Sequence, residues 1–126
     1  NLQPSPVQGG QVKADQGYTR QILVNLIGNA IKFTHQGKVE VSLKSSGNYL
    51  NVYVKDSGMG IAKKDQSLVF DKFFQVISSS KGRPSGTGLG LYLSSQIAKK
   101  MVGKLLLEKS EEGRGSTFVL SLPMVL

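Results

Sequence analysis

Three polar side chains recur at helical spacing in the stretch 25–34, N-L-I-G-N-A-I-K-F-T. At about 100° per residue, Asn25, Asn29 and Lys32 fall within roughly 60° of one another around a helix axis. Apolar residues cover most of the remaining circumference, namely Ile22, Leu23, Leu26, Ile27, Ala30 and Ile31. Because an unpaired polar group in a core costs about 1–3 kcal/mol, this stripe needs a polar partner. Two carboxamides and an ammonium group suit a metal-bound phosphate; a satisfied polar network within the protein is the alternative.

Two glycine clusters could hold the rest of such a ligand. Asp56-x-Gly58-x-Gly60 ends an alternating stretch; its glycines let a ligand approach the backbone, and its carboxylate can accept a hydrogen bond from an amino group such as that of adenine. G-T-G-L-G-L at 86–91 opens a helical pattern, whose free N–H groups and positive dipole end favour anions. Alone, the first cluster also fits a turn with a capping aspartate, and the second is a weak signal. The Walker signature G-x-x-x-x-G-K-[ST] is absent.

Hydrophobic periodicity predicts the elements that position these clusters. One helix is predicted from Asp15 to about Thr34, ended near Gly37, and another from the 86–90 glycines to about Val102. A short helix is predicted over 64–73, followed by a loop over 75–86 whose length is typical of functional loops. Two hairpins are predicted, with strands 38–44 and 49–55 and strands 104–110 and 116–122.

The apolar positions of these elements predict one buried side for each. In the strands this face comprises Val39, Val41, Leu43, Leu50, Val52, Val54, Phe118, Leu120 and Leu122. In the last helix the i, i+4 stripe comprises Leu89, Leu93, Ile97 and Met101. The fold class predicted is α+β, a two-layer sandwich with helices on one face of a mixed, mostly antiparallel sheet.

Composition limits the class of protein. A chain of 126 residues is expected to form a single domain, 1–126, with a lead-in at 1–11. It has no cysteine, which excludes disulfides and thiolate metal sites, and no apolar run near the roughly 20 residues of a membrane span. The net charge is +8, but the basic residues are scattered, which favours solvated faces with a modest bias toward polyphosphate.

In their order along the chain, these motifs resemble the ATP-binding catalytic domain of histidine kinases, in the gyrase, Hsp90, histidine kinase and MutL superfamily. The stretch 25–34 resembles the family's N box, D-S-G-M-G-I at 56–61 its G1 box, F-D-K-F-F-Q at 70–75 its F box, and G-T-G-L-G-L-Y-L-S at 86–94 its G2 box. G-R-G-S-T-F-V-L-S-L-P at 113–123 resembles its closing hairpin. The resemblance spans about 15–123 and implies the Bergerat ATP-binding fold, with an ATP lid at 75–87.

The resemblance also implies roles for individual residues. Asn29 would coordinate Mg2+, Asn25 would lie beside the phosphates and Lys32 would contact one, so that Asn25 and Lys32 are the catalytic candidates. Phe33 would lie near the adenine, and Asp56 would accept a hydrogen bond from its amino group. The other cofactor-binding candidates are Gly58, Gly60, Ile61, Gly86, Thr87, Gly88, Leu89, Gly90 and Thr117. The three phenylalanines Phe70, Phe73 and Phe74 are expected to pack against protein rather than touch nucleotide.

Three positions depart from the family pattern, and the one histidine does not resemble a phosphoacceptor. Asn25 stands where ATP-hydrolysing relatives carry a glutamate general base, and an amide takes no proton at neutral pH, which favours transfer to another nucleophile. Gln75 stands where some members have a phosphate-contacting arginine. Val102 replaces the first of two usual glycines and is interpreted as a packing variation. His35, the only histidine, lacks the acidic neighbour of a phosphoacceptor and is interpreted as a surface loop residue.

The resemblance implies an ATP- and Mg2+-binding protein-histidine kinase domain of a bacterial two-component or phosphorelay system. The implied partners are a separate dimerisation domain carrying the phosphoacceptor histidine, which this chain lacks, and a response regulator receiver domain. No nucleic acid partner is expected. The parent protein is expected to be a homodimer that can carry a membrane anchor. This domain itself is expected to lie in the cytoplasm. Two alternatives stay open: a non-enzymatic regulatory module, and a gyrase- or MutL-like ATPase acting on DNA.

Overall fold

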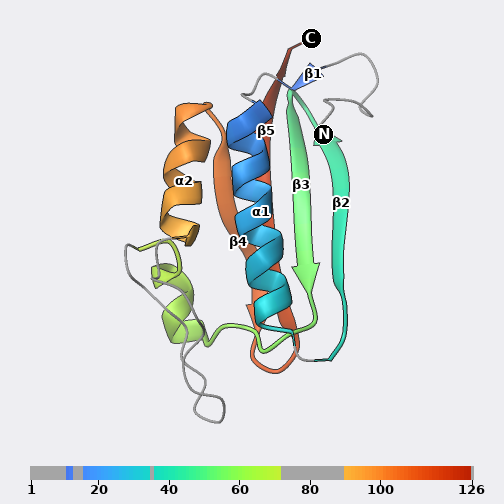
Figure 1. Ribbon diagram of the computed structural model, residues 1–126, viewed down its shortest axis with the longest axis vertical. Coiled ribbons are helices and arrows are strands. Elements are labelled where there is room, and N and C mark those ends of the chain that lie inside the picture. Colours follow the sequence, from blue (N-terminus) through green and yellow to red (C-terminus); the bar gives the residue numbers. More distant parts are fainter. Residues whose placement is uncertain (1–10, 13–15, 35, 72–89, 126) are drawn as a thin grey trace.

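A computed structural model describes residues 11–12, 16–34, 36–71 and 90–125 of the chain. The helices α1 (Gln16–Lys32) and α2 (Gly90–Lys100) and a 3-10 helix over Lys63–Leu68 lie on one face of a sheet (Figure 1). The strands are β1 (Gln11–Val12), β2 (Val39–Ser46), β3 (Tyr49–Asp56), β4 (Lys104–Glu111) and β5 (Gly115–Val125). The predicted two-layer α+β sandwich is confirmed.

The central strand of the sheet is β5, because its 11 residues pair with three other strands. It pairs with β3 on one side and with β4 and β1 on the other, and β2 forms the edge beyond β3. Every pairing in the described part of the sheet is antiparallel. The register sets Ser116 of β5 opposite Asp56 of β3 and opposite Ser110 of β4. Residues directly opposite share a face, so these three side chains form one row across the sheet.

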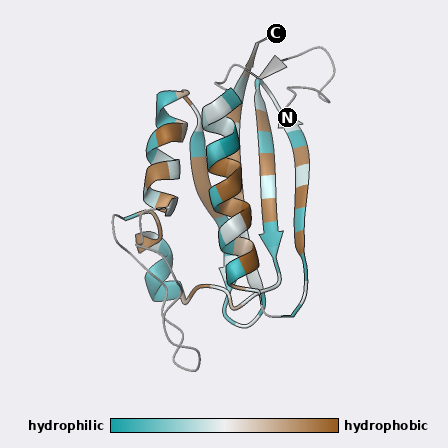
Figure 2. Ribbon diagram, viewed as in Figure 1, coloured by the Kyte–Doolittle hydropathy of each residue, from teal (hydrophilic) through white to brown (hydrophobic). Residues whose placement is uncertain are grey.

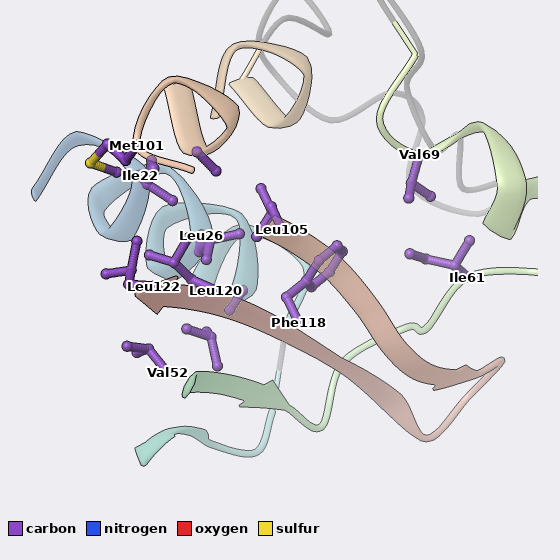
Figure 3. Close-up of a cluster of buried hydrophobic side chains, with 13 residues drawn as sticks. Ile22, Leu26, Val52, Ile61, Val69, Met101, Leu105, Phe118, Leu120 and Leu122 are labelled. Carbon is purple, nitrogen blue, oxygen red and sulfur yellow. The ribbon is translucent and has the colours of Figure 1, made fainter. Parts of the chain in front are cut away.

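The core lies between this sheet and α1. The alternating positions predicted to face inward on β3 and β5 are buried, namely Leu50, Val52, Val54, Phe118, Leu120 and Leu122. From α1 the residues Ile22, Leu26 and Ala30 enter the same cluster at i, i+4 spacing (Figure 3). The sequence therefore predicted the inner faces of β3 and β5 correctly, because a period-2 pattern marks one side of a strand. For α1 the prediction holds for Ile22, Leu26 and Ala30 but was wrong for Ile31, which is 61% exposed.

The edge strand β2 differs from the prediction. Val41 is 50% exposed and Leu43 is 45% exposed, although they stand opposite the buried Val54 and Val52. The prediction of a buried face was therefore wrong for these two residues. Figure 2 shows β2 at the edge of the molecule with alternating apolar residues and no helix across it in this view. Alternation identifies a face, but only the helix layer decides whether that face is covered.

The second helix follows its predicted apolar stripe only in part, because Met101 is 7% exposed and Ile97 packs against the core but Leu93 does not. The buried residues of α2 are Ser94 and Ala98, both 0% exposed, whereas Leu93 is 43% exposed. Small side chains at this contact allow α1 and α2 to approach closely. The short helix predicted over 64–73 is a 3-10 helix that ends at Leu68. Neither helix of the described chain is long and apolar enough to cross a membrane.

Candidate functional site

The polar stripe of α1 divides into one bonded amide and one unbonded amide. Nδ2 of Asn25 donates a hydrogen bond to Oγ of Ser94 on α2 over 2.9 Å. The half-buried side chain of Asn29, one turn later, makes no hydrogen bond with any residue of the described segments. Lys32 is exposed at the last turn, with Nζ 5.8 Å from the ring centroid of Phe33. A hydrogen bond within the protein thus satisfies the amide nitrogen of Asn25, whereas Asn29 keeps both of its amide groups available to a ligand.

The carboxyl end of α1 contacts the loop that follows β3. The carbonyl of Phe33 accepts a hydrogen bond from the N–H of Met59 over 3.2 Å. Gly58 lies so close that a Cβ there would overlap the same carbonyl oxygen. Glycine is therefore required at position 58 by close approach of the two backbones. The structure brings Phe33 of the predicted N box beside the predicted G1 box, as a shared nucleotide site requires.

Asp56 is a buried carboxylate at the end of β3. It is 7% exposed, and its Oδ1 accepts a hydrogen bond from the N–H of Gly58 over 2.9 Å. Burial raises the pKa of Asp56 above its ordinary value, and hydrogen bonds from the backbone of Gly58 and Ser116 partly oppose this rise. A carboxylate has about four lone-pair positions, so Asp56 retains acceptor capacity for an N–H group of a ligand.

A hydroxyl cluster that the sequence analysis missed supports this loop. The hydroxyls of Ser110 and Ser116 lie 2.7 Å apart, and Oγ of Ser110 accepts a hydrogen bond from the N–H of Ile61 over 2.8 Å. Nε2 of Gln66 donates to the carbonyls of Ile61 and Ser110 over 3.0 and 3.1 Å. Gly60 has φ +70° and faces the carbonyl of Glu111 with no room for a Cβ. Alternation from Phe118 and Leu120 could have placed Ser116 on the inward face of its strand, but the register shift between Leu107 and Lys109 interrupts the alternation of β4 before Ser110.

Three other predicted site residues lie outside the row of Asp56. Ile61 is buried at 7% exposure, and its side chain lies near Val69 (Figure 3). Thr117 pairs with Lys55, so it lies on the opposite face of the sheet from Asp56. The role of Thr117 stays a prediction, and Ser116 is the residue of this strand beside Asp56. Gly90 begins α2 with open space where a Cβ would lie.

Several predictions fall outside the residues that the structure describes. These are the cofactor-binding candidates Gly86, Thr87, Gly88 and Leu89, the lid at 75–87, and the interpretations of His35, Phe73, Phe74 and Gln75. Phe70 is described, and its ring packs edge-to-face on Phe118 with the centroids 6.0 Å apart. That contact is the packing role predicted for Phe70.

The donor groups on α1 fit a hard cation held with a polyphosphate. No cluster of three or more His, Cys, Asp or Glu residues that could hold a metal occurs among the described residues. Mg2+ prefers oxygen ligands and needs few from the protein, so the unbonded amide of Asn29 is a suitable ligand.

A sheet-end carboxylate, a glycine loop and an amide-bearing helix are the parts that a nucleotide-binding domain would need. Residues 14–126 match the family described as histidine kinase-, DNA gyrase B-, and HSP90-like ATPase, and the chain belongs to this family. It is 44% identical over 124 residues to the aerobic respiration control sensor protein ArcB of Escherichia coli K12, covering 97% of this chain and 16% of ArcB. It is 38% identical over 105 residues to the sensor histidine kinase RcsC of the same strain, covering 83% of this chain and 11% of RcsC.

Solved structures give the same assignment. Full-length ShkA in complex with AMPPNP has a TM-score of 0.78 at 32% identity, covering 98% of this chain and 24% of ShkA. The nucleotide-free catalytic domain of the histidine kinase ThkA has a TM-score of 0.74 at 30% identity, covering 90% of this chain and 71% of that domain. The chain is thus an ATP-binding catalytic domain of the histidine kinase type. It spans only 16% of the length of ArcB and 11% of the length of RcsC.

Proposed function

We propose that this domain binds ATP with Mg2+ and holds it for phosphoryl transfer to a histidine on a separate dimerisation domain. The state of Asn25 carries this proposal. Its carboxamide donates to Ser94, and an amide offers no base for a water molecule where ATP-hydrolysing relatives have a glutamate. The nucleophile would then come from another domain, and this chain would supply orientation and charge.

The loop after β3 would hold the base of the nucleotide. Asp56 keeps acceptor capacity beyond its hydrogen bond from Gly58, and an adenine amino group is a donor that this carboxylate could bind. Ser116 lies in the same row and adds a hydroxyl that both donates and accepts. Phe33 would lie near the adenine, because its carbonyl is already bonded to this loop.

The stripe on α1 would hold the phosphates. The amide oxygen of Asn29 would be the protein ligand to Mg2+, and Lys32 would contact a phosphate as a point charge. When bound, Mg2+ would supply positive charge that offsets the negative charge developing on the phosphates during transfer. Gly86, Thr87, Gly88, Leu89 and Gly90 stay candidates for the same end of the ligand.

The names of the relatives support a role in sensor-kinase signalling, since ArcB is a sensor protein and RcsC a sensor histidine kinase. We infer that the partners are a dimerisation domain with the acceptor histidine and a receiver domain of a response regulator. A homodimeric parent protein with this domain in the cytoplasm belongs to the same proposal.

Titration with a fluorescent ADP analogue tests nucleotide binding. The chain should bind saturably with Mg2+, and Asp56→Asn should weaken binding at least tenfold because the amino group then faces an amide with its own N–H groups. Asp65→Asn is the matched control, since Asp65 lies on the 3-10 helix outside the row of Asp56. Absence of saturable binding, or equal affinity of the Asp56 and Asp65 variants, would refute the site.

Phosphoryl transfer needs a second experiment. Labelled ATP, this domain and the dimerisation domain of the same parent protein should together give acid-labile label on the histidine of that domain. Asn29→Ala should abolish labelling while the protein stays folded by circular dichroism. Steady-state phosphate release without any acceptor, and no labelled histidine, would favour an ATP-hydrolysing function instead.

A further inference from the structure

Ser94 is a buried hydroxyl that joins the two helices of the domain. It lies in the second turn of α2, is 0% exposed, and accepts a hydrogen bond from Nδ2 of Asn25 over 2.9 Å. The two residues are 69 positions apart, so only the folded domain brings them together. Ala98, one turn further along α2, is also 0% exposed, so α2 presents its small residues to the packed interior.

This hydrogen bond sets the orientation of the Asn25 carboxamide. The amide nitrogen and oxygen lie on opposite sides of Cγ, so holding Nδ2 at Ser94 leaves Oδ1 free of that contact. An asparagine without such a bond can rotate by half a turn about χ2 and present either atom. Phosphate-bound Mg2+ and its waters need oxygen acceptors and exclude an amide nitrogen as a ligand. The orientation of Asn25 therefore decides which of its atoms a ligand on the stripe would meet.

We infer that Ser94 is a positioning residue for the phosphate end of the nucleotide site. By holding Nδ2 of Asn25, it leaves Oδ1 as the atom available to the Mg2+–phosphate group, one helical turn before the unbonded amide of Asn29. The inference rests on the proposed function, and it assigns a task to Ser94, which the sequence analysis did not single out. Ser94 acts through Asn25 and is not itself a ligand, because its Oγ is engaged and fully buried.

A purely structural tie between helices is the competing explanation, and the chain contains a matched control for it. Oγ of Ser121 on β5 donates to Oδ1 of Asn51 on β3 over 2.7 Å, and the two residues are 70 positions apart. This pair is also a serine–asparagine side-chain bond between distant segments, but it lies in the sheet and involves neither helix. Ser121→Ala removes such a bond without touching α1.

The test measures dissociation constants for ATP in Mg2+ and in EDTA for the full chain and its variants. Ser94→Ala should weaken binding about two- to tenfold in Mg2+, the range of one net hydrogen bond, and leave the affinity in EDTA unchanged. Ser121→Ala should lower the midpoint of urea unfolding but leave both affinities unchanged. Equal affinity of wild type and Ser94→Ala in Mg2+, or an equal loss in Mg2+ and EDTA, would overturn the inference.

A double-mutant cycle checks that Ser94 acts through Asn25. In an Asn25→Ala background, Ser94→Ala should cause no further loss of affinity in Mg2+, because the amide that it orients is gone. Full additivity of the two losses would overturn the inference. Failure of the wild type to bind ATP in Mg2+ would overturn the proposed function as well, whereas normal binding by both wild type and Ser94→Ala would overturn only the role of Ser94.

Discussion

Replacing Val102 by glycine should stabilise the protein by about 1 kcal/mol. Val102 follows α2 with φ 59°, and it is the one non-glycine residue with positive φ in the described segments. The N–H of Val102 donates to the carbonyl of Lys99 over 3.0 Å, and the N–H of Gly103 donates to that of Ala98 over 2.8 Å. These two bonds form a Schellman motif, whose left-handed position normally carries glycine. Val102 therefore strains the end of α2.

The magnitude results from two opposed effects. A left-handed conformation costs an L-residue about 1–2 kcal/mol, with a β-branched side chain at the upper end. Glycine offsets about 0.5–1 kcal/mol of this gain, because a glycine residue loses more conformational entropy on folding. Val102 is 72% exposed, so its removal uncovers little buried apolar surface. The same exposure contradicts the interpretation of Val102 as a packing variation.

Urea unfolding followed by circular dichroism measures the effect. Val102→Gly should move the midpoint to higher urea with an unchanged slope, and it should raise Tm by about 3–5 °C for a domain of this size. Val102→Ala is the control, because it removes the branch but keeps the Cβ that causes the strain. A glycine variant no more stable than wild type, or an alanine variant equally stabilised, would refute the reasoning.

Two further predictions concern the loop after β3 and helix α1. Because burial raises the pKa of Asp56 above its ordinary value, the folded state takes up the proton at a higher pH than the unfolded state does. The free energy of unfolding of the wild type, relative to that of Asp56→Asn, should therefore rise as pH falls through the pKa of the folded state. Nucleotide affinity should fall over the same range, because the protonated carboxyl accepts fewer hydrogen bonds. Urea unfolding and nucleotide titration at successive pH values measure both, and changes of the same sign would count against this role. Gly60→Ala should destabilise by about 1–3 kcal/mol, because its Cβ would overlap the carbonyl of Glu111, whereas Gly28→Ala should stabilise by about 0.5–1 kcal/mol in an open helical position. Equal urea midpoints for the two variants would contradict both geometries.

Much of the fold was predictable from local periodicity. The 3.6-residue period placed Ile22, Leu26 and Ala30 on the inner face of α1, and the alternation of β3 and β5 predicted their buried sides. The motif order also predicted that the N box and the G1 box belong to one site, and the contact of Phe33 with Met59 agrees. The two periodicities depend on residues close in sequence, whose relative directions are set by backbone geometry alone, whereas the shared site of the two boxes was implied by the family resemblance.

The pairing of distant residues was not predictable in this way. Periodicity placed Asn25 on the polar side of its helix, but only the packing of α2 supplies Ser94 as its partner. The sheet register likewise brings Ser110 and Ser116 together beside Asp56, from three different strands.

Local sequence therefore decided which side of each element is polar or apolar, and with it the N box, the G1 box and the fold class. Tertiary packing decided what meets each side: a serine for Asn25, solvent for the apolar face of β2, and a hydroxyl cluster for the loop after β3. The physical reason is that burial and hydrogen bonding depend on neighbours far apart in sequence. A spacing rule within one element carries no information about them.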